Sequence, residues 1–137
     1  MGTVSKDVIQ LIEEDTYFMR HYESGKTLFA GFEPAEPDNI ITVFDTYGKP
    51  PFLAIDGDTA NDLESPSIFI RVRNTDYQAA FEVAYAVKAL LHGRKHFQKN
   101  GTFYLSIVCT TSPAFYDFDE NGRTEVIMNF DIIRRKC

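Results

Sequence analysis

The chain has 137 residues, of which 44% are hydrophobic and 25% are charged, and its formal net charge is −6. This length suits one domain with a core of its own, and the composition excludes a largely disordered chain. The negative charge repels a phosphate backbone, so it disfavours tight reading of a DNA sequence but not the passage of DNA nearby.

No basic segment followed by an apolar stretch opens the chain, and no apolar run is long enough to span a bilayer. We therefore expect a protein that is made in a cytoplasm and has no membrane partner. The two cysteines are Cys109 and Cys137. We interpret them as a small core residue and a free tail thiol, although the sequence alone leaves a disulfide between them open.

The first elements in chain order are a helix and two strands. Ser5 is expected to cap the helix, whose apolar residues recur at helical spacing over residues 8–12. Residues 28–31 predict a short strand. Residues 40–46 are β-branched and aromatic, which predicts a buried strand.

Residues 52–65 begin apolar and become acidic. This pattern predicts a long, flexible loop or flap, and a small β-arm packed on its own domain is the alternative. Candidate subunit or partner contacts in this segment are Phe52, Leu53, Ile55, Asp56 and Asp58.

Strict alternation over residues 67–73 predicts a strand with Ile68, Ile70 and Val72 on one face. Arg71 and Arg73 point the other way. We expect these two arginines to meet the acids of a neighbouring subunit or the solvent.

The main helix is predicted to follow at once. Asn74 or Thr75 is expected to cap it, an apolar stripe runs over residues 77–91, and Gly93 is expected to stop it.

Two further strands are expected over residues 102–111 and 125–133. In the first, Phe103, Leu105, Ile107 and Cys109 are expected to share one face. A long corner over residues 112–123 is expected to join the strands, which would then pair antiparallel. The element order predicts an α+β fold with a mostly antiparallel or mixed sheet and helices packed on one face.

Three aromatic residues lie within this predicted corner, namely Phe115, Tyr116 and Phe118. Aromatic side chains in loops either cover the chain's own core or anchor a partner. We favour partner contact for at least one aromatic cluster.

No pattern in the chain predicts a reaction. Asp117-x-Asp119-x-Asn121-Gly122 matches the first half of a calcium loop, but Met128 stands where the essential twelfth carboxylate belongs. We interpret the segment as a turn.

His92 and His96 have helical spacing for zinc, yet Gly93 separates them and no third ligand is near. Cys109 has no evident catalytic partner. We therefore predict no catalytic residue, metal or cofactor. An acid- or metal-dependent hydrolase built on the acids of residues 56–64 is the least favoured alternative.

Several short motifs in a fixed order resemble one known family. They are Leu28-Phe29-Ala30-Gly31, Ile70-Arg71-Val72-Arg73, Leu90-Leu91-His92-Gly93, Thr111-Ser112-Pro113-x-Phe115 and Asp119-Glu120-Asn121-Gly122-Arg123-x-Glu125. Together they resemble the minor capsid, or tail terminator, proteins of long-tailed bacteriophages and prophages. The resemblance extends over about residues 4–133.

The resemblance implies a structural virion protein that is not an enzyme. Such a protein forms a ring, typically of six subunits, on the head-proximal end of the tail tube. The ring ends tube polymerisation, meets the head-completion (stopper) protein and lets DNA pass without specific binding. A small ligand- or protein-binding accessory module is the alternative.

Overall fold

The computed structural model describes residues 2–52 and 63–136. Two helices and six strands make up this part of the chain. In chain order they are α1 (Val4–Glu14), β1 (Leu28–Ala30), β2 (Ile40–Phe52), β3 (Leu63–Asn74), α2 (Tyr77–Leu91), β4 (Lys95–Lys99), β5 (Thr102–Phe118) and β6 (Thr124–Lys136).

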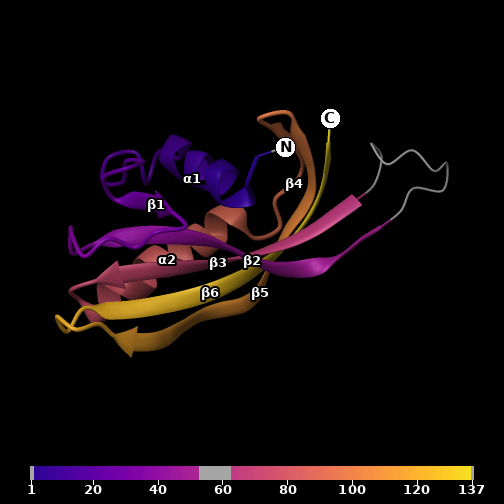
Figure 1. Cartoon of the computed structure of the whole chain (residues 1–137). Coiled ribbons are helices and arrows are strands. Elements are labelled where there is room, and N and C mark those ends of the chain that lie inside the picture. Colours follow the sequence, from indigo (N-terminus) through magenta and orange to yellow (C-terminus); the bar gives the residue numbers. More distant parts are fainter. Residues whose placement is uncertain (1, 53–62, 137) are drawn as a thin grey trace.

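The six strands form one curled sheet in the order β1-β2-β3-β6-β5-β4. The β1–β2 pair is parallel, and every other pair is antiparallel. At one end, β2 and β3 project beyond the other strands (Figure 1). The predicted α+β fold with a mostly antiparallel or mixed sheet is confirmed.

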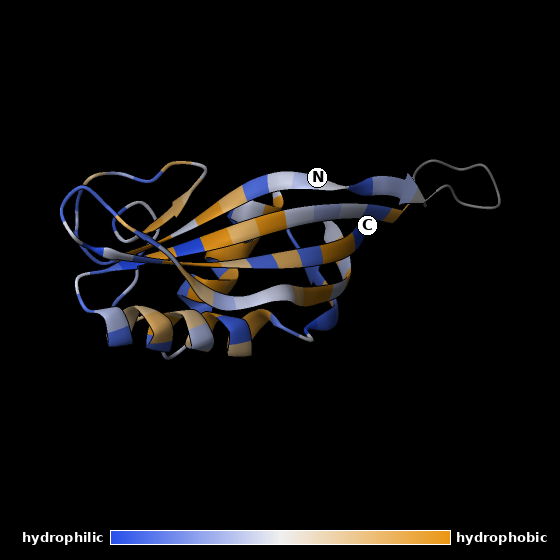
Figure 2. Cartoon of the chain, turned by 90° about the horizontal axis from the view of Figure 1, so that it is seen from below, coloured by the Kyte–Doolittle hydropathy of each residue, from blue (hydrophilic) through white to orange (hydrophobic). Residues whose placement is uncertain are grey.

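Both helices contribute to a single hydrophobic core against one face of the sheet, which we call the helix face. Figure 2 shows α2 lying along this side. Alternation works as predicted in β3, where Ile68, Ile70 and Val72 are fully buried. It works equally in β6, whose core side chains are Val126, Met128, Phe130 and Ile132. Each such burial stabilises the fold by about 1.5–3 kcal/mol.

The start of α2 differs from the prediction by a residue or two. Its N-cap is Asp76, whose carboxylate accepts a hydrogen bond from the Ala79 amide at 2.9 Å. The predicted cap Asn74 instead accepts from the amide of Asp76 at 3.0 Å. The predicted stop is confirmed, because Gly93 has a φ of 83° just after the last turn.

The cap of α1 is also shifted. Thr3, not Ser5, is the N-cap, and its hydroxyl accepts from the Lys6 amide at 3.4 Å. Ser5 lies in the first turn, where its hydroxyl and its amide donate to the two carboxylate oxygens of Asp45 at 2.6 and 3.1 Å. This contact ties α1 to β2.

A buried polar contact ties α1 to β5 as well. The Tyr104 hydroxyl donates to Asp7, and both side chains are about 1% exposed. The side-chain amide of Asn100 donates to the other Asp7 oxygen at 2.7 Å. Burial, with the hydrogen bond to Asp7, raises the pKa of Tyr104, so its hydroxyl stays a proton donor.

Alternation fails in the first half of β5. The pairing with β6 shifts between Tyr104 and Ser106. Because an inserted residue reverses which side chains face inward, Tyr104 and Ile107 are buried while Phe103 and Leu105 are only half-buried. The predicted single face of Phe103, Leu105, Ile107 and Cys109 is therefore wrong.

The predicted flap is partly strand. β2 continues to Phe52, whose backbone pairs with Leu63 in β3, while residues 53–62 lie outside the described residues. The strands approach closely at Gly48, where a Cβ would lie 2.1 Å from the Ser65 carbonyl oxygen. Only glycine fits this irregularity in the ladder.

Two other boundaries differ from the prediction. β5 runs to Phe118, so the predicted corner over residues 112–123 shrinks to a turn over residues 119–123. The edge strand β4 was not predicted, because its five residues are mostly polar. Neither described helix is long and apolar enough to cross a membrane.

Candidate interaction surfaces

Neither described helix covers the second face of the sheet, which we call the open face. At one end, Arg73 fastens the loop over residues 31–39 to it. Its guanidinium donates to the carbonyl oxygens of Pro34, Pro37 and Asp38 at 2.7, 2.6 and 3.2 Å. Only 3% of the residue is exposed. Its donors therefore bind a loop of its own chain. The partners expected from the sequence were the acids of a neighbouring subunit or the solvent.

Arg123 fastens the same loop from the β5–β6 turn. It donates to the Ala35 carbonyl oxygen at 2.6 Å and to the Asp38 carboxylate at 3.1 Å. Asp119 accepts from Arg123 Nε at 2.6 Å and from the Asn121 amide at 3.0 Å. The segment that resembles half a calcium loop is thus a hydrogen-bonded turn whose carboxylate is already used.

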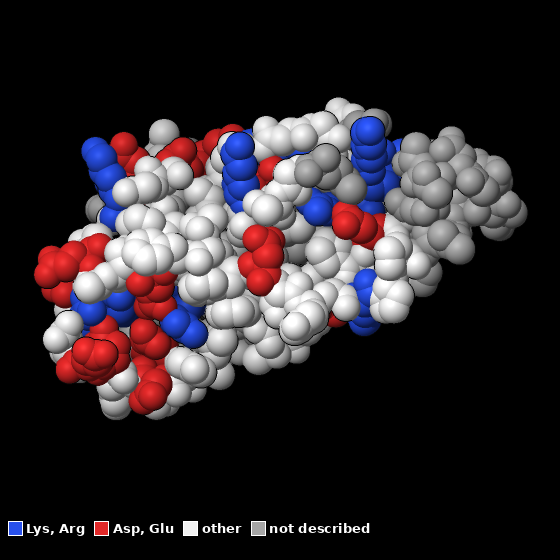
Figure 3. All heavy atoms as spheres, viewed as in Figure 1, with Lys and Arg blue, Asp and Glu red and all other residues white. Residues whose placement is uncertain are grey.

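Arg71 lies between two carboxylates. Its Nη1 is 2.6 Å from Glu33, and its Nε is 3.9 Å from Glu125. Burial raises the pKa of Glu125 to about 7, the neighbouring Glu33 adds to the shift, and Arg71 opposes it. Figure 3 shows acidic and basic side chains crowded together at one end of the molecule.

Aromatic rings surround the same guanidinium. Phe44 and Phe69 stack with centroids 4.7 Å apart. The carbon at the centre of the Arg71 guanidinium lies 5.5 and 5.9 Å from these rings and 5.0 Å from Tyr116. Arg71 is therefore held by cation–π contacts as well as by ion pairs.

The three predicted corner aromatics separate onto the two faces. Tyr116 lies on the open face over Arg71. Phe115 lies against α2, with ring centroids 5.9 Å from Tyr77 and 4.9 Å from Phe118. Tyr77, Phe115 and Phe118 are 50%, 41% and 54% exposed. We call these three residues the aromatic tip.

The other half of the open face is hollowed by a groove of about 270 Å³. We call it the open-face groove, and its lining residues are Lys49, Ser65, Ser106, Val108, Thr110, Asp131, Ile132 and Ile133. Val108 is 42% exposed within it. The surface here is mostly apolar, in contrast to the charged end of the same face.

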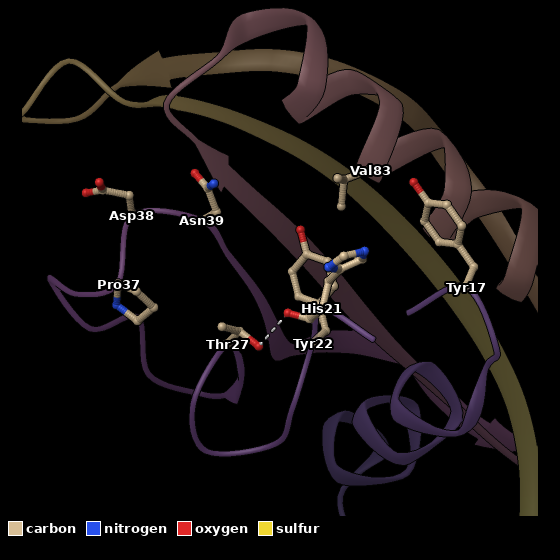
Figure 4. A pocket seen from close by; sticks show the side chains of 8 residues that line it. All are labelled: Tyr17, His21, Tyr22, Thr27, Pro37, Asp38, Asn39 and Val83. Atoms are coloured by element: carbon tan, nitrogen blue, oxygen red, sulfur yellow. Dashed lines mark hydrogen bonds between the residues drawn. The ribbon is translucent and has the colours of Figure 1, made fainter. Parts of the chain in front are cut away.

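A larger cavity of about 570 Å³ lies beside α2 (Figure 4). Two of its polar side chains make hydrogen bonds within the protein itself. The Asn39 side chain accepts from the Thr75 amide at 3.1 Å, and the Thr27 hydroxyl donates to the His21 carbonyl oxygen at 3.4 Å. Burial raises the pKa of Tyr22 to about 12.

The side chains considered for chemistry are likewise in structural use. His92 accepts the Cys109 amide at 2.9 Å through Nδ1, and His96 stacks on Phe103. Burial raises the pKa of the Cys109 thiol, which disfavours a reactive thiolate. Among residues 2–52 and 63–136, no group of three or more metal-ligating side chains comes together.

The remaining predicted contact residues stay predictions. Phe52 ends β2, and Leu53, Ile55, Asp56 and Asp58 lie outside the described residues. We call the polar contacts of Glu33, Arg71, Arg73 and Arg123 the open-face network. The sequence analysis did not predict that Glu33 and Arg123 take part in it. Their signal is weak, because each lies in a turn or loop distant in sequence from Arg71.

The family comparison decides what kind of protein carries these surfaces. A family model described as bacteriophage tail terminator protein matches residues 12–136. This chain belongs to that family. Membership gives the chain a structural role in a phage tail, and the predicted resemblance is confirmed.

Solved structures share the fold of this terminator. A chain from the virion of a native gene transfer agent (GTA) particle matches with a TM-score of 0.69 and 14% identity, covering 98% of this chain and 96% of that one. A second solved chain, described without a function, matches with a TM-score of 0.51 and 15% identity over 95% and 96%. No curated protein matches the sequence.

Proposed function

We propose that this terminator caps the head-proximal end of the phage tail tube as a ring of identical subunits, typically six. The ring ends polymerisation of the tail tube protein and joins the tail to the head-completion protein. The family match over residues 12–136 carries this proposal. Two separate exposed surfaces, the aromatic tip and the open-face groove, support it because a cyclic ring needs two different patches on each subunit.

The role is mechanical and requires no reaction. DNA would pass through the bore without specific binding, and each added subunit brings six further negative charges that disfavour adhesion to phosphates. We place the working protein in the virion and its synthesis in the bacterial host cytoplasm.

Tail length tests the capping role directly. In a phage that encodes this chain, deletion of the gene should give tail tubes longer than normal that carry no heads. Supplying the chain from a plasmid should restore both length and infectivity. A plasmid carrying Tyr85→Ser, a change at a 52% exposed helix position, is the matched positive control. Normal-length tails joined to heads in the deletion strain would contradict the proposal.

Native mass across a concentration series separates the ring from the alternative, a small binding module. The chain weighs 15.6 kDa, and a closed ring of six would have six times that mass. A discrete closed oligomer supports the terminator role. A monomer at every concentration supports the accessory module instead. Stabilisation by divalent cations in a thermal-shift screen would favour the hydrolase alternative.

A further inference from the structure

The aromatic tip has the character of a protein-docking element. The ring of Phe115 contacts those of Tyr77 and Phe118, and the three rings, each 41% exposed or more, lie where β5 and α2 meet. Exposed aromatic residues of this kind supply much of the binding energy at protein interfaces. None of these three residues belongs to the buried hydrophobic core.

Exposed acidic residues adjoin the tip in the chain. Asp76, Asp117 and Glu120 are exposed next to Tyr77 and Phe118 in the chain. None of the three forms an ion pair within residues 2–52 and 63–136. The tip is therefore an exposed aromatic surface with acidic residues next to it in the chain.

The charged residues at the open-face groove are mostly basic. Lys49 lines it with a side chain that is 73% exposed and that reaches Asp131 only at 3.8 Å. Arg135 lies two residues beyond Ile133 on the same face, over the ring of Phe103 at 5.0 Å. The groove is thus an apolar hollow with the Lys49–Asp131 ion pair in its lining and a further cation, Arg135, on the same face.

The size of the groove argues for side chains as its occupant. Its 270 Å³ falls just below the roughly 300–1,000 Å³ of typical small-molecule sites. The lining offers Val108 and Ile133 for apolar contact but no convergent set of buried polar groups. One or two aromatic rings from another protein suit such a hollow.

We propose that the aromatic tip of each subunit inserts into the open-face groove of the next copy of this chain. The pairing rests on the proposed ring and specifies how it closes. Apolar surface meets apolar surface, and the acids next to the tip in the chain meet Lys49 and Arg135.

A single chain cannot make this contact with itself. Phe115 pairs with Val126 on the helix face, whereas Val108 pairs with Asp131 on the open face. Five residues of β6 separate the two positions, roughly 17 Å at about 3.4 Å per residue. A tip-to-groove contact is consequently head to tail, and it leaves no tip or groove unused when the ring closes.

Two variants test the pairing. Phe118→Asp damages the tip, and Val108→Arg fills the groove with a bulky cation. Both positions are exposed, so thermal melting should match the unchanged chain. By native mass spectrometry, each variant alone should need at least about 30-fold more protein for half-assembly. Tyr85→Ser should assemble normally.

Mixing the two variants gives the decisive result. The tip variant keeps its groove and the groove variant keeps its tip, so an equal mixture should form dimers and nothing larger. Rings from either variant alone, or a mixture that stays monomeric, would overturn the pairing.

Other outcomes point elsewhere. If the groove variant forms rings but no longer binds tail tubes, the groove receives the tube protein and the pairing is wrong. If the unchanged chain is itself monomeric at every concentration, the proposed ring fails, and the pairing fails with it. If the unchanged ring forms and both variants form it equally well, only the pairing fails.

Discussion

The two faces of this sheet are built from the same strands but are stabilised in different ways. On the helix face, Phe130 and its neighbours are apolar and fully buried. On the open face, Arg71 and Arg73 are held by carboxylates, carbonyl oxygens and aromatic rings. The first arrangement depends on the amount of buried apolar surface, and the second on the placement of individual hydrogen bonds.

This difference assigns separate tasks to the faces. Burial on the helix face provides most of the folding free energy. The network on the open face orders the loop over residues 31–39 and leaves the open-face groove uncovered. Changes on the two faces should therefore have different consequences.

Truncation of a matched aromatic on each face should show the largest contrast. Phe130→Ala should lower the free energy of unfolding by about 3–5 kcal/mol, because it leaves a cavity in the core. Phe69→Ala, which removes a half-buried ring stacked on Phe44, should cost only about 1–2 kcal/mol. Urea denaturation measures both. Equal losses would show that the open face is as much a core as the helix face.

Removal of the buried guanidinium should come next in size. Arg73→Ala leaves three loop carbonyl oxygens without their donor, so we expect a loss of about 3 kcal/mol and faster proteolysis within residues 31–39. Arg135→Ala is the matched control, since that side chain lies over Phe103, and it should cost less than about 1 kcal/mol. If the loop stays protease-resistant in Arg73→Ala, Arg73 does not fasten it.

The pH dependence tests the carboxyl pair on the open face. The folded pKa of Glu125 is about 7 against an ordinary value of 4.5, so the native state holds more protons than the unfolded state between these values. Stability from this group is therefore lost as pH rises from about 4.5 to 7. Glu125→Gln removes that loss and should gain about 1–3 kcal/mol relative to the unchanged chain between pH 5 and pH 8.

Chemical denaturation at several pH values measures this gain. Glu120→Gln, at an exposed position in the adjoining turn, is the control and should follow the unchanged chain. A constant difference between Glu125→Gln and the unchanged chain at all pH values would contradict the raised pKa.

The smallest effect concerns the outermost ring over Arg71. Tyr116→Leu should cost about 0.5–1 kcal/mol, because it removes one exposed cation–π contact. Tyr116→Phe keeps the ring and should melt like the unchanged chain. A loss of equal size in both variants would assign the effect to the hydroxyl instead.

The same contrast explains what the sequence could predict. The helix face follows local periodicity, so Ile68, Ile70 and Val72 were correctly assigned to the core. An irregular ladder has no such signal, and the shift after Tyr104 made the prediction wrong for Phe103 and Leu105 while Ile107 is buried as predicted.

The open-face network was beyond prediction for another reason. The partners of Arg73 lie 35 to 39 residues away in a loop, and no local pattern pairs them. The sequence predicted a single aromatic cluster over residues 115–118. It could not show that Tyr116 lies on the opposite face from the aromatic tip, because this depends on how β5 pairs with β6.

Gly48 has a consequence for how this chain can change over generations. It is an exposed position in a polar stretch, where substitutions are ordinarily tolerated. Yet any side chain there would meet the Ser65 oxygen at 2.1 Å and the Pro66 Cα at 2.7 Å, and both of these are backbone atoms that cannot rotate aside. A single codon change at this site would therefore act less like a surface substitution than like an inserted residue, displacing every pair of the projecting β2–β3 arm beyond it.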